Sequence, residues 1–126
     1  MVQMDAIIIK EPIKLSTNLL VFDEDDNVYL CIESYLNENK ITKCKLIECS
    51  GLLKEGTVNT FERSSYKKID FKDKEIGRVS GELKIEKGKI IGNMKICSNE
   101  RKPIIGTLVS AKAKQDFSLK ISYLKD

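Results

Sequence analysis

The chain has 126 residues, of which 41% are hydrophobic and 33% are charged, with a formal net charge of +3 and no histidine. This length and composition are typical of one folded domain, and they exclude both a disordered tail and a chain with two separate cores. Without an imidazole the chain lacks the usual zinc ligand and the usual general base near neutral pH. Most metal hydrolases and all histidine-containing triads are therefore excluded.

The predicted elements begin with a short strand over residues 6–10 and an apolar stretch over residues 19–22. An acidic run at residues 23–26 follows, and either Asp25 or Asp26 is expected to cap a helix there, because negative charge is favourable at a helix N-terminus. Asn39 is expected to end the same helix in a left-handed conformation.

The helix itself is predicted from apolar residues that recur with the spacing of one helical face. These residues are Val28, Cys31, Ile32, Tyr35 and Leu36. The pattern predicts a helix over residues 27–37, and no other segment of the chain shows such a pattern.

Everything after residue 40 is predicted to form strands. Alternation is clearest over residues 79–86, and Lys87-Gly88 is a hairpin turn motif. The expected strands cover residues 43–49, 57–62, 66–71, 79–86, 89–98, 104–111 and 117–124. Since no linker or repeat divides the chain, residues 1–126 are predicted to form a single domain of the α+β class. One main helix packs on a curved, mainly antiparallel sheet of six to eight strands.

The four cysteines are Cys31, Cys44, Cys49 and Cys97, and none forms a C-x-x-C pair. Neither a zinc ribbon nor a thioredoxin-type site is indicated. The apolar run at residues 7–9 is too short for a signal peptide, and no run approaches the roughly 20 residues that span a membrane. We therefore expect a cytoplasmic protein with reduced thiols and no membrane partner.

Charge is distributed unevenly along the chain. Residues 1–40 carry eight acids and three lysines, net −5, whereas residues 41–126 carry nineteen bases and eleven acids, net +8. The candidate basic patch consists of Lys84, Lys87, Lys89, Arg101, Lys102, Lys112 and Lys114. These cations would suit a nucleic acid, but the preferred interpretation is a solvated Lys/Glu surface. Tyr66 is the only candidate identified for stacking on a base.

From Asp25 onward, the order of elements and short motifs resembles the plant-and-prokaryote-conserved (PPC) domain. The acidic helix start, the helix and a glycine-terminated strand read DDNVYLCIESYLNENKITKCKLIECSGLL, and the following strand pair reads GTVNTFERSSYKKIDF. The family's Glu-Ile…Leu-Ser-Gly element corresponds to residues 75–81, with Val79 at the leucine position, and Lys87-Gly88 stands at the family's Asp-Gly turn. The resemblance covers residues 25–126 and implies a compact domain that assembles as a homotrimer.

The family's His-Leu-His-Ala and Gly-Gly-His-Leu motifs correspond here to residues 93–96 and 105–108, so Asn93, Lys95 and Thr107 replace the three histidines. A relative of similar fold is a zinc-dependent decarboxylase that uses such histidines. An ammonium, an amide and a hydroxyl are poor ligands for a transition metal. We therefore expect no metal, no cofactor and no enzymatic activity. The AT-hook segment that accompanies the domain in plants is also absent.

These observations favour a stand-alone, homotrimeric binding and assembly module that is DNA-associated or regulatory, with another copy, a protein or DNA as its partner. Tyr35 and the C-terminal strand are candidates for the contact between subunits. The alternative is a sensor of a small anion or metabolite, which would bind in a cleft formed by Asn93, Lys95 and Thr107. The same cleft could instead be filled by the aliphatic stem of the lysine.

Overall fold

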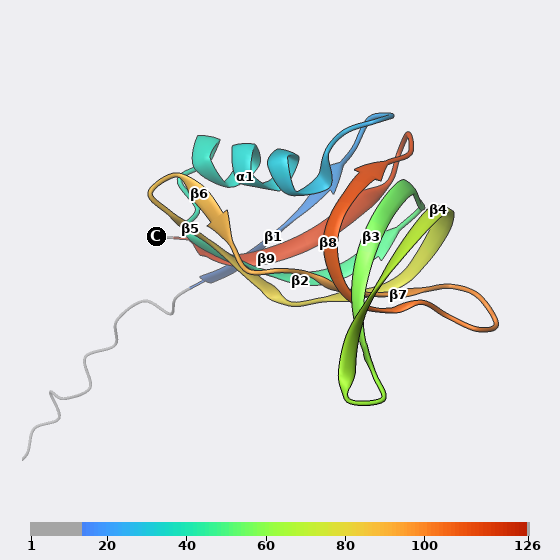
Figure 1. Cartoon of the computed structure of the whole chain (residues 1–126). Helices are drawn as coiled ribbons and strands as arrows, with labels where there is room; N and C mark the ends of the chain where they lie inside the picture. Colours follow the sequence, from blue (N-terminus) through green and yellow to red (C-terminus); the bar gives the residue numbers. More distant parts are fainter. Residues whose placement is uncertain (1–13, 126) are drawn as a thin grey trace, which may run out of the picture.

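The computed structural model describes residues 14–125, which form one helix and nine strands (Figure 1). The elements are β1 (Lys14–Val21), α1 (Val28–Glu38), β2 (Lys43–Ser50), β3 (Leu52–Glu62), β4 (Ser65–Ser80), β5 (Glu82–Glu86), β6 (Lys89–Ile91), β7 (Lys95–Ser98), β8 (Ile105–Ala113) and β9 (Ser118–Lys125). The strand predicted over residues 6–10 lies outside the described residues. No helix of the described part is long and apolar enough to cross a membrane.

The strands form two sheets. One is a five-stranded antiparallel sheet in the order β1-β9-β2-β5-β6, and the other is a closed barrel of β3, β4, β7 and β8. The α+β class with curved antiparallel sheets is therefore confirmed. The described residues form nine strands where six to eight were expected, and β1 had been expected only as an apolar stretch over residues 19–22. Two predicted strands, over residues 79–86 and 89–98, are each interrupted, and the first part of the former belongs to β4, which begins at Ser65.

Glycine divides both of these strands. Gly81 (φ 126°) separates β4 from β5, and Gly92 (φ 107°) separates β6 from β7. Residues that have a side chain rarely adopt a positive φ. At Gly92 a Cβ would also lie 2.6 Å from the Glu82 carbonyl oxygen. The predictions of unbroken strands over residues 79–86 and 89–98 were therefore wrong. The chain leaves the barrel at the first glycine and returns after the second.

The helix was predicted to within one residue, but its caps were not. Asn27 is the N-cap, and its Oδ1 accepts a hydrogen bond from the Leu30 amide at 3.1 Å. Asp25 has a φ of 69° and cannot supply the extended backbone that an N-cap needs, while Asp26 accepts from the Asp23 amide instead. At the other end Asn39 has a φ of −99°, and Lys40 takes the left-handed conformation.

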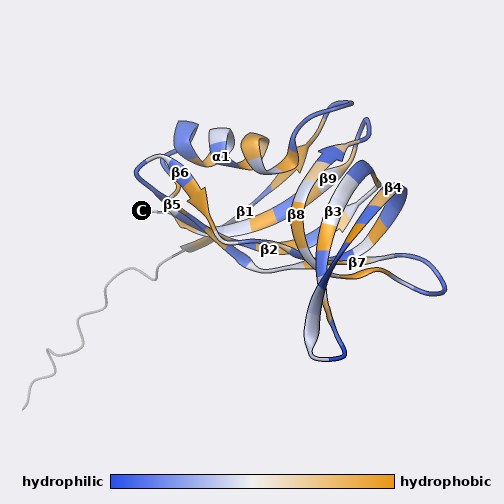
Figure 2. Cartoon of the chain, in the orientation of Figure 1, coloured by the Kyte–Doolittle hydropathy of each residue, from blue (hydrophilic) through white to orange (hydrophobic). Residues whose placement is uncertain are grey.

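The core lies between α1 and the five-stranded sheet and continues into the barrel. Val28, Ile32 and Leu36 form the buried face of the helix, while Leu119 and Ile121 lie on the sheet face beneath it. Figure 2 shows hydrophobic residues along the strands beneath the helix and through the barrel. Burial of these side chains supplies the main driving force for folding.

The hairpin of β5 and β6 is anchored to the helix by polar contacts. Its Lys87-Gly88 turn has positive φ at both positions, which confirms the predicted hairpin. The Ile90 amide donates to Glu33 at 2.8 Å, and the Asn37 side chain donates to the Gly88 carbonyl oxygen at 3.0 Å.

Candidate functional site

Asn93, Lys95 and Thr107 lie close together where β7 meets β8. Lys95 and Thr107 are direct cross-strand partners, and the Asn93 amide donates to the Leu108 carbonyl oxygen at 3.3 Å. Asn93 and Lys95 are exposed, whereas Thr107 is half-buried. The two segments that the sequence analysis compared with the family's histidine motifs are thus adjacent in space.

A tyrosine from the helix holds this position in place. The Tyr29 hydroxyl donates to the Leu108 carbonyl oxygen at 2.5 Å and accepts from the Met94 amide at 2.9 Å. Burial raises the pKa of Tyr29 above its usual value of 10.0. The phenol therefore stays neutral and acts as a donor and an acceptor between α1, the start of β7 and β8. Tyr29 could not be identified from the sequence, because its role depends on contacts between distant segments.

The donor set at this position does not fit a metal ion. The Asn93 amide is engaged with backbone, Lys95 carries an ammonium, and a threonine hydroxyl is a weak ligand. Within residues 14–125 no three His, Cys, Asp or Glu side chains are grouped so that they could bind one. A metabolite bound at this position would therefore be held by hydrogen bonds and charge alone.

Two of these residues, Lys95 and Thr107, belong to a longer polar row on the outer face of the barrel. Thr107 is also the partner of Asn59 on β3, and Asn59 is the partner of Lys68 on β4. Cross-strand partners present their side chains on the same face. We call Lys95, Thr107, Asn59 and Lys68 the polar row; it places a cation at each end and two hydrogen-bonding side chains between them.

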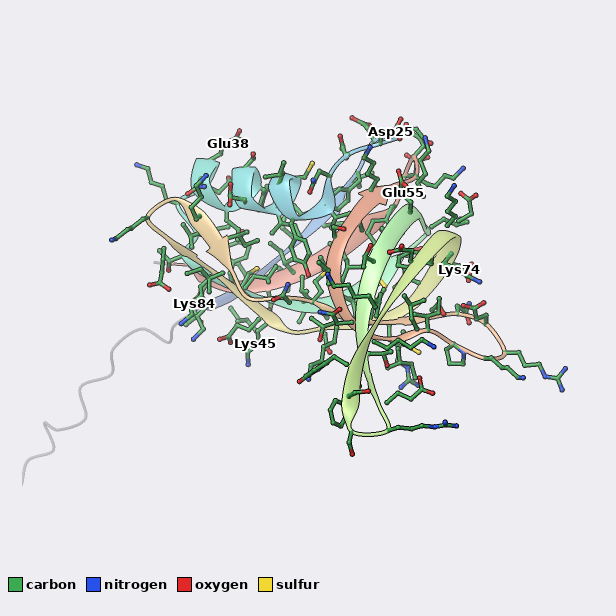
Figure 3. All side chains as sticks on the ribbon, in the orientation of Figure 1. Asp25, Glu38, Lys45, Glu55, Lys74 and Lys84 are labelled. Atoms are coloured by element: carbon green, nitrogen blue, oxygen red, sulfur yellow. The ribbon has the colours of Figure 1, made fainter. Side chains whose placement is uncertain are left out.

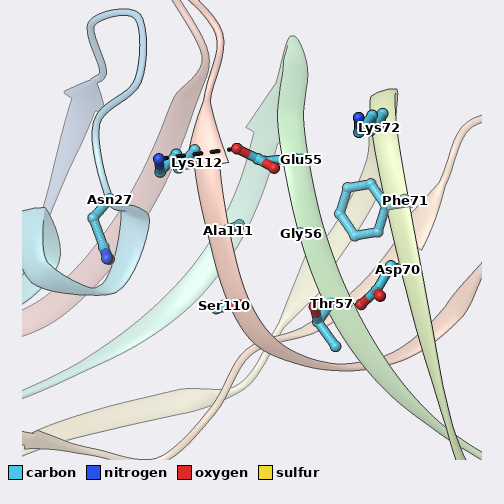
Figure 4. A pocket seen from close by; sticks show the side chains of 10 residues that line it. All are labelled: Asn27, Glu55, Gly56, Thr57, Asp70, Phe71, Lys72, Ser110, Ala111 and Lys112. Carbon is cyan, nitrogen blue, oxygen red and sulfur yellow. Dashed lines mark hydrogen bonds and ion pairs between the residues drawn. The ribbon is translucent and has the colours of Figure 1, made fainter.

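A groove of about 740 Å³ lies against β3, β4 and β8 (Figure 4), and Thr57 and Asp70 in its lining are each two positions from a residue of the polar row. Its lining residues are Asn27, Glu55, Gly56, Thr57, Asp70, Phe71, Lys72, Ser110, Ala111 and Lys112. Thr57 donates to Asp70 at 2.7 Å, and Lys112 forms an ion pair with Glu55 at 3.9 Å. The residues that line the groove therefore satisfy much of one another's charge and hydrogen-bonding capacity.

The groove does not include Asn93, Lys95 or Thr107, and only Lys112 among its residues was singled out from the sequence. One clue was the alternation of polar side chains at positions 55, 57 and 59, which marks the outer face of a strand. Gly56 was a second clue, because a glycine inside a strand often marks a close approach of another group. In the structure a Cβ at this position would lie 2.6 Å from the Phe71 ring. Neither clue reveals which strands pair.

The seven residues of the candidate basic patch are not brought together. Lys84, Lys87 and Lys89 lie on the β5–β6 hairpin, whereas Arg101 and Lys102 lie on the β7–β8 loop at the opposite end of the molecule (Figure 1). The remaining two lie at the end of β8, where Lys112 pairs with Glu55 and Lys114 pairs with Asp73 at 3.3 Å. Figure 3 shows Lys84 and Glu55 far apart on the molecule.

The four thiols are free, and burial makes three of them, Cys31, Cys44 and Cys49, poor nucleophiles. Desolvation raises the pKa of Cys44 and of Cys49 to about 11, and it also raises the pKa of Cys31. A thiol is reactive only as a thiolate. Cys44 lies in the core as a small apolar side chain, whereas Cys31, Cys49 and Cys97 are half-buried.

No family model and no curated protein matches the chain. Solved structures do. The metal-containing protein AF0104 from Archaeoglobus fulgidus is 17% identical, with a TM-score of 0.75 over 94% of this chain and 85% of that one. A PPC protein from Pyrococcus horikoshii is 18% identical, with a TM-score of 0.70 over 94% and 86% of the two chains.

A third similar structure is that of a candidate DNA-binding protein from Bacteroides thetaiotaomicron. It is 14% identical, with a TM-score of 0.69 over 87% of this chain and 79% of that one. At such identities a likeness shows the fold and not the chemistry. The comparisons therefore establish that this chain has the fold of the PPC proteins.

Proposed function

We propose that this protein is a non-catalytic binding and assembly module of the cytoplasm, homotrimeric and associated with DNA. The observation that carries the proposal is the replacement of the family's metal-binding histidines by Asn93, Lys95 and Thr107. The hydrogen bonds from Asn93 and Tyr29 to Leu108 give this position a structural role. A site organised in this way supports binding by shape and charge, without metal chemistry.

Self-association is supported by exposed apolar side chains on one face of the five-stranded sheet. Leu15 and Leu124 are cross-strand partners on the face opposite α1, and Leu19 and Val21 lie further along the same face of β1. All four are exposed, and such clusters on small domains usually mark contacts with partners. Tyr35, the other candidate, instead contacts Asn18 within the same chain.

Sedimentation equilibrium on the wild type and a Leu19→Lys variant tests the assembly. We expect a trimer for the wild type and dissociation of the variant, because a charge would be buried in the contact. Leu30→Lys is the matched control, since Leu30 is equally exposed but lies on the helix. A wild type that stays monomeric at high micromolar concentration would overturn the assembly.

DNA association is supported by the fold and by charge. One protein of similar structure is a candidate DNA-binding protein, and residues 41–126 carry a net charge of +8. Gel retardation at low salt tests it directly. We expect affinity to fall steeply as salt rises, because bound phosphates release counterions. Absence of retardation at micromolar protein would remove this part of the proposal.

A second candidate function, the binding of a small anion, is favoured by the polar row. Lys95 and Thr107 are cross-strand partners, and Lys68 on β4 is the cation at the other end of the polar row. Titration calorimetry with phosphate on the wild type and on Lys95→Ala tests this candidate. Binding that is lost in the variant supports it, whereas no heat of binding with the wild type excludes it.

A further inference from the structure

The long hairpin of β3 and β4 continues past the barrel (Figure 1), and we call residues 59–68, from the last pair of β3 with β8 to the tip, the arm. Near its tip two aromatic side chains are cross-strand partners. Phe61 is 64% exposed and Tyr66 is 78% exposed, and their ring centroids lie 5.2 Å apart at an interplanar angle of 66°. The rings stabilise each other, yet most of their surface remains in contact with water.

Cations surround the aromatic pair. Arg63 lies in the turn, and Lys67 and Lys68 follow Tyr66 on β4, whereas Glu62 is the one acid of the arm. The arm therefore has a net charge of +2. Among residues 14–125 the ion pairs involve none of these three cations: the pairs are formed by Lys43, Lys54, Lys74, Lys112, Lys114 and Lys120. The arm cations are thus available to an anionic partner.

The turn at the tip is strained. Arg63 (φ 49°) and Ser64 (φ 66°) link the paired residues Glu62 and Ser65, and a two-residue turn with positive φ at both positions favours Asn-Gly. Left-handed backbone is unfavourable for residues with a side chain. The turn thus keeps a cation at the tip where folding alone would favour glycine or asparagine.

The arm is continuous with the polar row. Lys68, the last residue of the row, lies two positions from Tyr66, so both side chains are on the same face of β4. Along this face the aromatic pair is followed by Lys68 and Asn59, then by Thr107 and Lys95. Aromatic rings beside a line of cations and hydrogen-bonding groups match the alternation of bases and phosphates in an unpaired strand.

We propose that the β3–β4 arm binds single-stranded nucleic acid, with a base stacked on Phe61 and Tyr66 and with phosphates held by Arg63 and Lys68. This inference rests on the proposed association with DNA, and it names the surface and the form of nucleic acid. A second copy of the arm is a poorer partner for it, because two arms of net charge +2 repel each other.

Fluorescence anisotropy with a labelled oligothymidylate and with a duplex of equal length tests the proposal. We expect the single strand to bind more tightly than the duplex. Phe61→Ala and Tyr66→Ala should each weaken binding roughly tenfold, since stacking contributes about 1–3 kcal/mol per base. Tyr66→Phe keeps the ring and should bind normally. Circular dichroism verifies that each variant is folded.

The contribution of the cations is measured by salt dependence. Arg63→Ala and Lys68→Ala should each reduce the slope of log affinity against log salt by roughly 0.7. Lys84→Ala and Lys87→Ala remove the same charge from the β5–β6 hairpin and are the matched controls. We expect these two variants to retain the wild-type slope.

The outcomes separate this inference from the proposed function. If the wild type binds nucleic acid and the arm variants bind equally well, or if the duplex binds more tightly, the arm inference is overturned and DNA association stands. If neither form binds at low salt, both are overturned. If Phe61→Ala lowers the subunit number in light scattering without changing nucleic-acid affinity, the arm is a contact between copies and the inference is wrong.

Discussion

The hydroxyl of Tyr29 lies 2.5 Å from the carbonyl oxygen of Leu108, and this hydrogen bond joins the helix to the barrel. The same hydroxyl accepts from the Met94 amide at 2.9 Å, so one side chain of the helix serves two backbone groups that lie 65 and 79 residues further along the chain. Asn93 adds a second, longer bond to Leu108, at 3.3 Å. The geometry around Lys95 and Thr107 therefore depends on a residue of the helix.

Tyr29→Phe is expected to lower the free energy of unfolding by about 1–3 kcal/mol, because the Met94 amide loses its acceptor in a partly buried position. Urea denaturation measures the change. Tyr66→Phe is the control, since that hydroxyl is exposed and its loss should be neutral. Equal stability of the wild type and Tyr29→Phe would show that the hydrogen bond does not organise this position.

Gly106→Ala should destabilise the barrel. A Cβ at Gly106 would lie 2.3 Å from the Asn59 carbonyl oxygen and 2.5 Å from a methyl group of Val58, and a backbone oxygen cannot easily move away. The loss should be about 1–3 kcal/mol or more, measured by thermal or urea unfolding. Gly77→Ala is the control, because its nearest contact would be 3.2 Å away. Two equally stable variants would contradict the close approach of β3 and β8.

Ser64→Gly should stabilise the protein by about 0.5–1 kcal/mol, because glycine adopts the positive φ of this position without strain. Arg63 is retained in this variant, so nucleic-acid affinity should not change. Arg63→Asn should also relieve strain, but it should weaken binding. Thermal unfolding combined with anisotropy separates the two effects, and a less stable Ser64→Gly variant would be evidence against a strained turn.

Acid should weaken the contact between the acidic loop and β3. Lys54 lies 2.7 Å from Asp25 and 3.3 Å from Glu24. A hydrogen bond from Lys54 lowers the pKa of Asp25 below 3.8, and the Gln115 backbone amide, followed by Lys54, lowers the pKa of Glu24 below 4.5. A carboxyl group whose pKa is lowered by folding stabilises the protein above its ordinary pKa, and this contribution is lost as pH falls through the lowered value.

Unfolding should therefore become easier as pH falls below about 4.5, the ordinary pKa of Glu24. Urea denaturation at a series of pH values measures the slope, which Lys54→Met should reduce. Lys43→Met removes a more exposed pair with Glu82, at 3.4 Å, and serves as the control. An identical slope in the wild type and Lys54→Met would mean that the pair has no influence on stability.

The helix and the β5–β6 turn could be predicted because each depends on short-range rules. The helix was predicted from the spacing of Val28, Ile32 and Leu36, which form its buried face, and the hairpin was predicted from its glycine-containing turn. The N-cap could not be assigned, because Asp25, Asp26 and Asn27 all suit that position. The choice depends on the contacts of the acidic loop, in which Asp26 accepts from the Asp23 amide and Asp25 pairs with Lys54. Such tertiary contacts cannot be inferred from the residues around the helix start alone.

The division of two strands at Gly81 and Gly92 also could not be predicted from the sequence. Alternation of apolar residues continues through both glycines, so the pattern alone predicts unbroken strands. The proximity of Lys95 to Thr107 was anticipated only through the family resemblance. The groove and the polar row required knowledge of which strands pair, and that is determined by contacts between residues far apart in the chain.

Native mass spectrometry of the protein in buffer containing zinc tests the central claim most directly, because it reports subunit number and bound metal together. The account predicts one species at three times the chain mass of 14.3 kDa, without stoichiometric zinc. A monomer, or a complex with one zinc ion per chain that a chelator removes, would contradict it.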